Sequence, residues 1–163
     1  MSKIITVEKA IKLSGKLRKE GKVIVLTGGC FDVLHLGHIK FIEAAKKKGD
    51  LLFVFVESDE KVRELKGKNR PINNQAERAE VLAAIQFVDY VIKIPFFEEN
   101  SSYDKLITKL HPSIIAITKE SAALKHAQRQ AQGINAQVVE VIGLINDKST
   151  SKIAKIIADE NKL

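Results

Sequence analysis

The chain has 163 residues, a formal net charge of +7, 45% hydrophobic residues and 29% charged residues. This length suits one domain with a sizeable core, and the composition is that of an ordinary globular protein. The short apolar runs exclude a membrane span, the first residues lack the apolar core of a secretory signal, and the single cysteine excludes an intrachain disulfide. We therefore expect one cytoplasmic domain, residues 1–163.

The positive charge is compatible with a nucleic-acid partner, with a solvated basic surface, or with a site that collects phosphorylated small molecules. The lysines are spread along predicted helices, as in 46–48, and the sequence contains neither an aromatic RNA-binding motif nor a zinc finger. We expect no nucleic-acid partner and no membrane partner.

Helical and strand patterns alternate along the chain. Thr6 is the expected N-cap of a lead-in helix that runs from Val7 to about Glu20 and stops at Gly21. The patterns then predict, in chain order, strand 23–27, helix 39–48, strand 51–56, helix 61–65, helix 75–86, strand 88–94, helix 103–110, strand 114–117, helix 121–132, strand 137–142 and helix 149–159.

This alternation predicts an α/β fold: a single Rossmann-like domain, with a parallel sheet of about five strands, helices on both faces and right-handed crossovers. The run 51–56 is apolar throughout, as expected of a strand that is buried on both faces. Ligands of such sheets lie at the carboxyl ends of the strands, near the point where strand order reverses. We therefore expect the site in the loop that follows strand 23–27.

That loop, residues 28–38, reads Gly-Gly-Cys-Phe-Asp-Val-Leu-His-Leu-Gly-His. Its two leading glycines let the backbone approach a phosphate closely. His35 and His38 stand at the mouth of a helix, where they can donate hydrogen bonds to phosphoryl oxygens beside the positive helix end. Gly37 leaves room between them for a base or a ribose. The spacing matches neither the Walker loop nor the dinucleotide fingerprint.

The histidines and the cysteine also have other interpretations. A zinc site at His35 and His38 would need a third ligand, and His111 and His126 are far away in sequence, so we expect no protein-bound metal. Cys30 lacks a partner base for nucleophilic or redox chemistry, which favours a backbone and packing role.

The loop resembles the His-x-Gly-His signature of the cytidylyltransferase-like nucleotidyltransferases. Within them the chain is most similar to the adenylyltransferase domains that act on D-glycero-β-D-manno-heptose 1-phosphate. The similarity runs from Lys3 to about Ile157. Besides the loop, it rests on the lead-in helix and on residues 65–73, 77–78, 88–91 and 149–153.

The resemblance implies one site built from distant parts of the chain. The implied catalytic residues are His35, His38 and Lys66. The implied nucleotide-binding residues are Gly28, Gly29, Cys30, Phe31, Gly37, Lys148, Ser149, Thr150 and Ser151. The implied substrate-binding residues are Asp32, Lys68 and Arg70. Three cations spaced two residues apart, at 66, 68 and 70, can gather several phosphates. Asp32 is also expected to fix the loop through hydrogen bonds, and the 149–151 segment is both a helix N-cap and an anion site.

The implied reaction is nucleotidyl transfer. A phosphate oxygen of the acceptor attacks the α-phosphorus of a nucleoside triphosphate, and pyrophosphate leaves. The acceptor phosphate is already ionised, so catalysis consists of positioning and charge neutralisation. His35 and His38 would bind α-phosphate oxygens, Lys66 would stabilise the transition state, and the Ser149 helix end would hold pyrophosphate. Mg²⁺ is expected to arrive with the triphosphate.

The preferred substrates are ATP and heptose 1-phosphate, which give ADP-heptose. Residues 86–87 and 144–147 stand where glycerol-3-phosphate cytidylyltransferases carry arginines, which favours ATP over CTP. Residues 118–121 depart from the corresponding stretch of the heptose enzymes, so the acceptor stays open.

Several alternatives remain open. The chain is compatible with a glycerol-3-phosphate-type cytidylyltransferase, with another small-phosphate adenylyltransferase, and with a non-catalytic nucleotide-binding module. Class I aminoacyl-tRNA synthetases share the histidine signature, but this chain is too short for their tRNA-recognition domains. The resemblance also implies a homodimer, and the sequence does not tell whether the enzyme works with a separate kinase.

Overall fold

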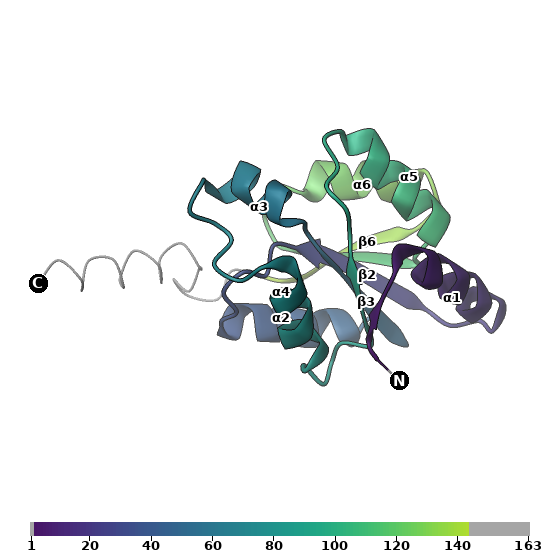
Figure 1. Cartoon of the computed structure of the whole chain (residues 1–163). Helices are drawn as coiled ribbons and strands as arrows, with labels where there is room; N and C mark the ends of the chain where they lie inside the picture. The colour runs from purple at the N-terminus through teal and green to yellow at the C-terminus, as the bar shows by residue number, and fades with distance from the viewer. Residues whose placement is uncertain (1, 144–163) are drawn as a thin grey trace, which may run out of the picture.

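The computed structural model describes residues 2–143 of the chain (Figure 1). The predicted helix 149–159 lies outside the described residues. So do the expected anion-binding residues, which are Lys148, Ser149, Thr150 and Ser151. No helix between residues 2 and 143 is long and apolar enough to cross a membrane.

Strands and helices alternate over the described part of the chain. The strands are β1 (Ile4–Ile5), β2 (Ile24–Gly29), β3 (Leu51–Val56), β4 (Tyr90–Lys93), β5 (Ile114–Thr118) and β6 (Gln137–Ile142). The helices are α1 (Val7–Lys19), α2 (Leu36–Lys46), α3 (Asp59–Lys66), α4 (Gln75–Ala83), α5 (Asn100–Leu110) and α6 (Leu124–Gln132).

The strands form a six-stranded parallel sheet in the order β1-β4-β3-β2-β5-β6. This confirms the predicted Rossmann-like α/β fold and corrects the strand number from about five to six. The additional strand, β1, pairs Ile4 with Val91 and Ile5 with Ile92 of β4. Two residues are too few to produce a strand pattern, so only the pairing with β4 reveals this edge strand.

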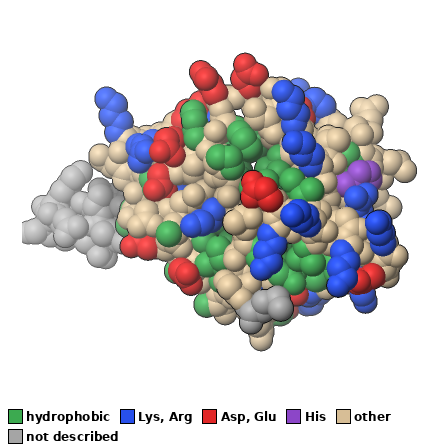
Figure 2. Space-filling view, turned by 45° about the vertical axis from the view of Figure 1, so that its right-hand side comes forward, with side chains coloured by type: hydrophobic (Ala, Val, Ile, Leu, Met, Phe, Trp, Pro, Cys, Tyr) green, Lys and Arg blue, Asp and Glu red, His purple; other side chains and the backbone are tan. Residues whose placement is uncertain are grey.

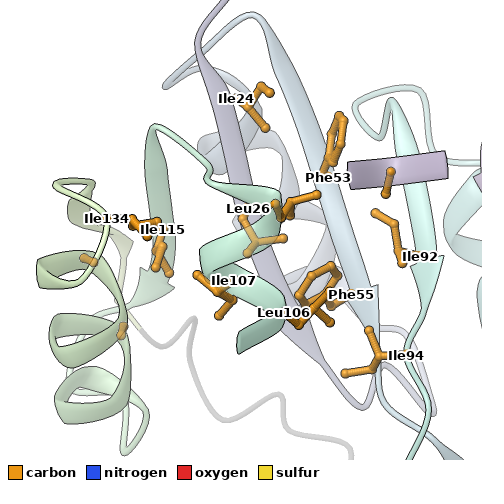
Figure 3. Close-up of a cluster of buried hydrophobic side chains, with 14 of the residues drawn as sticks. Ile24, Leu26, Phe53, Phe55, Ile92, Ile94, Leu106, Ile107, Ile115 and Ile134 are labelled. Carbon is orange, nitrogen blue, oxygen red and sulfur yellow. The ribbon is translucent and has the colours of Figure 1, made fainter. Parts of the chain in front are cut away.

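Helices cover both faces of the sheet, as predicted (Figure 1). Helices α1, α5 and α6 pack on one face, and α2 and α4 pack on the other. Figure 3 shows the first of these two buried clusters, in which Leu26 of β2 and Phe55 of β3 lie against Leu106 and Ile107 of α5. The strands β2 and β3 are therefore fixed from both sides, which gives the loops at their carboxyl ends a rigid base.

Capping explains where the helices begin. The Thr6 side chain accepts a hydrogen bond of 3.2 Å from the Lys9 amide, so α1 begins where predicted. Helix α2 begins at Leu36, three residues before the predicted start, because His35 itself is the N-cap. Helix α3 begins two residues early at Asp59, since the Ser58 side chain accepts from an amide of its first turn.

Strand β2 begins one residue late and runs two residues beyond its predicted end at Thr27. Gly28 and Gly29 continue the ladder opposite Phe55 and Val56 of β3, because pairing with a fully buried neighbour outweighs the low strand preference of glycine.

Strand order reverses at β2. On one side of it lie β3 and β4, which follow it in sequence, and on the other side lie β5 and β6. The carboxyl end of β2 is thus the position where a crevice forms in a sheet of this kind.

Positive and negative side chains are mixed on the face of the molecule that Figure 2 shows. Figure 2 shows one face of the molecule, on which Lys and Arg side chains are interspersed with Asp and Glu side chains and with apolar ones. On this face the positive charge does not form one continuous patch.

Candidate active site

The end of β2 and the loop that follows it are shaped by close packing around Gly28, Gly29 and Phe31. A Cβ atom on Gly29 would lie 3.1 Å from Cε2 of the Phe31 ring, and one on Gly28 would lie 3.4 Å from the Cβ of Phe55. Phe31 is buried and has a positive φ of 47°, an unusual backbone conformation for a bulky residue. Small residues at 28 and 29 therefore let the chain turn sharply at the sheet edge.

His35 joins the loop to α2. Its Nδ1 atom accepts a hydrogen bond of 3.1 Å from the Gly37 amide at the N-terminus of the helix. A nitrogen that accepts carries no proton, so in neutral His35 the proton resides on Nε2. The imidazole is therefore fixed in the tautomer that can donate from Nε2, beside amides that carry the positive end of the helix dipole.

His38 lies in the first turn of α2 and its ring stacks on that of His35. The ring centroids are 4.0 Å apart with a tilt of 37°, and the Phe31 ring meets His38 edge-on at 5.5 Å. Burial, helped by the neighbouring His35, lowers the pKa of His38 to about 4, so the ring is neutral near pH 7. Its Nδ1 atom is buried and has no hydrogen-bond partner among residues 2–143, so packing holds the ring in place.

Asp32 fastens a second loop, residues 67–74, to the histidine loop. Its buried carboxylate accepts hydrogen bonds from the amides of Ile72, at 2.8 Å, and Asn73, at 3.0 Å, and from Nε of Arg70. The Asn73 side chain donates in return to the Asp32 carbonyl at 2.9 Å. Burial alone would raise the pKa of Asp32, but these donors outweigh it and hold the pKa below its usual value.

Arg78 of α4 also connects the loops, through hydrogen bonds from its buried side chain. Its guanidinium is fully buried and donates to the carbonyls of Asn73 at 3.0 Å, Glu57 at 2.8 Å and Cys30, and to Oδ1 of Asp59 at 2.7 Å. The three carbonyls belong to the loops after β2, after β3 and before α4, and Asp59 is the first residue of α3. One side chain therefore sets the spacing of all three loops.

Lys66 ends α3, four residues before Arg70, which donates to Asp32 of the histidine loop. Burial raises the pKa of the Cys30 thiol, and the positive charge of Lys66 partly opposes that effect. The thiol therefore stays protonated near neutral pH, while the Cys30 carbonyl serves as an acceptor for Arg78. Gly67 has a φ of 101° and ends the helix, so the chain turns directly after Lys66.

The structure thus brings together most of the predicted site residues that it describes. Residues 28–38 run from the last two residues of β2 through the connecting loop into the first turn of α2, and Arg70 forms an ion pair with Asp32 of that loop. Lys68 is exposed on the same second loop. Arg78 holds the backbone of both loops through Cys30 and Asn73, and the pattern that could have revealed its role is an arginine next to the apolar face of a predicted helix.

Two other features of the described residues bear on the chemistry. No three His, Cys, Asp or Glu side chains between residues 2 and 143 gather in a way that could hold a metal ion. A hollow of about 510 Å³ lies at the amino ends of β2, β5 and β6, the opposite edge of the sheet, where Arg18, Lys48 and His111 are among its lining residues. It is therefore separate from the histidine loop.

Comparisons with known proteins agree with this geometry. Residues 26–161 match the family model described as cytidylyltransferase-like. The bifunctional protein HldE of Aliarcobacter butzleri is 36% identical over 99% of this chain, and that of a Nitratiruptor species is 43% identical over 88% of it. The matches cover 32% and 29% of those two proteins, so the chain spans about a third of the length of the curated relatives.

Two solved structures are also similar. The lipopolysaccharide core biosynthesis protein from Thermoplasma volcanium aligns with a TM-score of 0.62 at 25% identity, over 78% of this chain and 100% of the other. Pantoate-beta-alanine ligase from Francisella tularensis, solved with beta-gamma ATP and beta-alanine, aligns with a TM-score of 0.65 at 16% identity, over 99% of this chain and 77% of the other. The second likeness concerns the fold alone.

Proposed function

Because this chain belongs to the cytidylyltransferase-like family, we propose that it is an adenylyltransferase that transfers AMP from ATP to heptose 1-phosphate. A new bond forms between an acceptor phosphate oxygen and the α-phosphorus, the bond from the α-phosphorus to the bridging oxygen breaks, and that oxygen leaves with pyrophosphate. The relatives named HldE and the lipopolysaccharide core biosynthesis protein support a sugar phosphate as the acceptor.

The observation that carries this proposal is the stacked pair His35 and His38 at the start of α2. One imidazole caps the helix and the other is neutral, with ring centroids 4.0 Å apart. Two donors beside a helix N-terminus suit the oxygens of an α-phosphate. Neutral donors bind these oxygens without taking part in acid–base chemistry, which the ionised acceptor phosphate does not require.

We assign to Lys66 the neutralisation of charge that develops on the α-phosphate. It ends the helix that follows β3, four residues before Arg70, which donates to Asp32 of the histidine loop. Lys148, Ser149, Thr150 and Ser151 remain proposed ligands of the β- and γ-phosphates.

Mg²⁺ is proposed to enter with ATP, and when bound it would spread the charge of the triphosphate. The described part of the site offers imidazoles, amides and cations but no three-residue cluster of metal ligands, so phosphate oxygens rather than a protein cage would hold the ion. We further propose one nucleotidyltransferase domain over residues 1–163 and a homodimer.

A matrix of pyrophosphate-release assays tests the proposed reaction. It crosses ATP and CTP with heptose 1-phosphate, glycerol 3-phosphate, pantetheine 4′-phosphate and flavin mononucleotide in the presence of Mg²⁺. We expect release with ATP and heptose 1-phosphate only. Activity with CTP alone, or with a non-sugar acceptor alone, would replace this proposal, and nucleotide binding without release in any combination would indicate a non-catalytic module.

A further inference from the structure

A carboxylate stands beside the histidine loop, on the side away from β5. Glu57 follows the last residue of β3 directly, and its amide donates a hydrogen bond of 3.1 Å to the Gly29 carbonyl. Its own carbonyl is one of the acceptors of Arg78, at 2.8 Å. The backbone of Glu57 is therefore locked to the start of the histidine loop.

The side chain of Glu57 is held by α5. The Tyr103 hydroxyl donates to Oε2 of Glu57 at 2.8 Å, across 46 positions of sequence. Burial raises the pKa of this carboxyl, and the hydrogen bond from Tyr103 and the charge of Lys61 oppose that effect. The second oxygen, Oε1, accepts no hydrogen bond from residues 2–143. It is also accessible to solvent. One carboxylate oxygen is thus positioned, and the other can accept.

Aromatic rings line the same side. The Phe97 ring, from the segment after β4, meets Tyr103 edge-on at 5.0 Å. Phe96 is 44% exposed, and the Lys61 ammonium lies 5.5 Å from the centroid of its ring. We call Glu57, Tyr103, Phe96 and Phe97 the β3–β4 wall. Carboxylates and aromatic rings together suit a polyhydroxylated ring, whose hydroxyl groups donate and whose C–H face packs on apolar surface.

Electrostatics narrows what the wall can bind. A fixed carboxylate near a phosphate site repels phosphate groups, so it weakens binding unless the ligand brings hydrogen-bond donors to it. The hydroxyl groups of a sugar phosphate are such donors, and each bond to a charged acceptor is stronger than one between neutral groups. We propose that Glu57, positioned by Tyr103, binds hydroxyl groups of the acceptor and selects polyhydroxylated acceptors for the reaction. This inference rests on the proposed function, because it assigns the acceptor side of the same site.

The test compares E57Q and Y103F with the wild-type chain in steady-state assays. The amide keeps the shape of Glu57 but loses its charge, so we expect the acceptor KM to rise about tenfold and the ATP KM to stay within about twofold. Y103F keeps the ring and releases the carboxylate, so the acceptor KM should rise about threefold with kcat unchanged. E60Q on the exposed first turn of α3 and Y90F, at a partly buried position packed against the core, are matched controls, and both should behave as wild type.

Direct binding separates this inference from the proposed reaction. Titration calorimetry with a non-hydrolysable ATP analogue bound would compare heptose 1-phosphate with inorganic phosphate, which brings no sugar hydroxyls. E57Q should bind heptose 1-phosphate more weakly and inorganic phosphate equally or more tightly. Changes of the same sign for both ligands, or an equal rise in both KM values, would overturn the role of Glu57. If the assay matrix names another acceptor, that acceptor replaces heptose 1-phosphate in the same titration.

Discussion

The Arg70 guanidinium and the Asp32 carboxylate form an ion pair in which the Asp32 side chain is 1% exposed and the Arg70 side chain 14%. The pair joins the loop after α3 to the loop after β2. Arg70 was expected to gather phosphates with Lys66 and Lys68. In the structure Arg70 instead pairs with Asp32, and this ion pair holds the two loops together.

Replacing Asp32 with asparagine should destabilise the fold. The amide keeps the shape but removes the charge that accepts from Arg70, and its NH₂ group cannot accept from the amides of residues 72 and 73. We expect the free energy of unfolding to fall by about 2–4 kcal/mol in urea titrations. D50N is the control, because exposed Asp50 accepts one amide hydrogen bond at 2.7 Å, and it should lose about 1 kcal/mol or less. Equal losses in the two variants would contradict this role of Asp32.

Arg78→Lys should lower the free energy of unfolding more than is usual for an exchange of one cation for another. A lysine cannot reach four acceptors that belong to three loops and the start of α3, and it would leave buried carbonyls without donors. We expect a loss of about 3 kcal/mol in the free energy of unfolding. Arg63→Lys on the exposed face of α3 is the matched control. A shift in denaturation midpoint no larger than that of the control would show that Arg78 does not hold the loops.

His38→Ala should lower kcat/KM by about 10²–10³-fold, because one donor to the α-phosphate is removed. Circular dichroism should show an unchanged fold, since the side chain lies at the edge of the core. His126→Ala, at an exposed position of α6, should keep wild-type turnover. Near-normal rates for His38→Ala would remove the histidine loop from the mechanism.

Lys66→Ala and Lys68→Ala separate two exposed cations of the same region. Lys66 is proposed to neutralise charge on the α-phosphate, so its loss should lower kcat by about 10²-fold. The Lys68 variant should change kcat by less than about threefold and act through KM instead. Single-turnover measurements with saturating ATP check this order, and a reversed order would exchange the roles of the two lysines.

Acid should destabilise the fold through His38. Its folded-state pKa of about 4 lies below the ordinary value of about 6.5, so the unfolded chain binds more protons between these two values. The free energy of unfolding should therefore fall as the pH drops from about 6.5 to about 4, by about 2 kcal/mol from this residue. Urea titrations of wild type and His38→Gln over this range check the effect, because the variant should lack this part of the slope. Parallel pH profiles would assign the acid sensitivity elsewhere.

Local patterns predicted most of the fold. The strand over 51–56 has the predicted bounds of β3, because a fully apolar run between a glycine turn and polar residues permits little else. The predicted bounds were wrong where a contact with a distant residue or a side-chain cap determines whether a strand or helix begins. Ile4 and Ile5 form a strand only against β4, and His35 starts α2 only because its ring accepts from an amide. The predicted resemblance to cytidylyltransferase-like proteins is confirmed by the family match over residues 26–161.

The site was accessible from sequence only in part. The histidine loop carries its signature in eleven consecutive residues, so it could be located without a structure. The partners of Arg78 include Cys30, 48 positions away, and those of Glu57 include Tyr103, 46 positions away. No periodicity links such pairs, because the strand order alone brings them together. The roles assigned to the site residues remain predictions for the experiments above.

The bonds of Arg78 and Asp32 also bear on how fast a nucleotide can be captured. Three loops that would otherwise fluctuate are ordered when the chain folds, so their conformational entropy is lost before any nucleotide arrives. Association then requires no coupled ordering of these segments, and the encounter should proceed at the rate of a preorganised receptor. Stopped-flow binding of ATP should accordingly show a single phase whose rate constant rises linearly with nucleotide concentration.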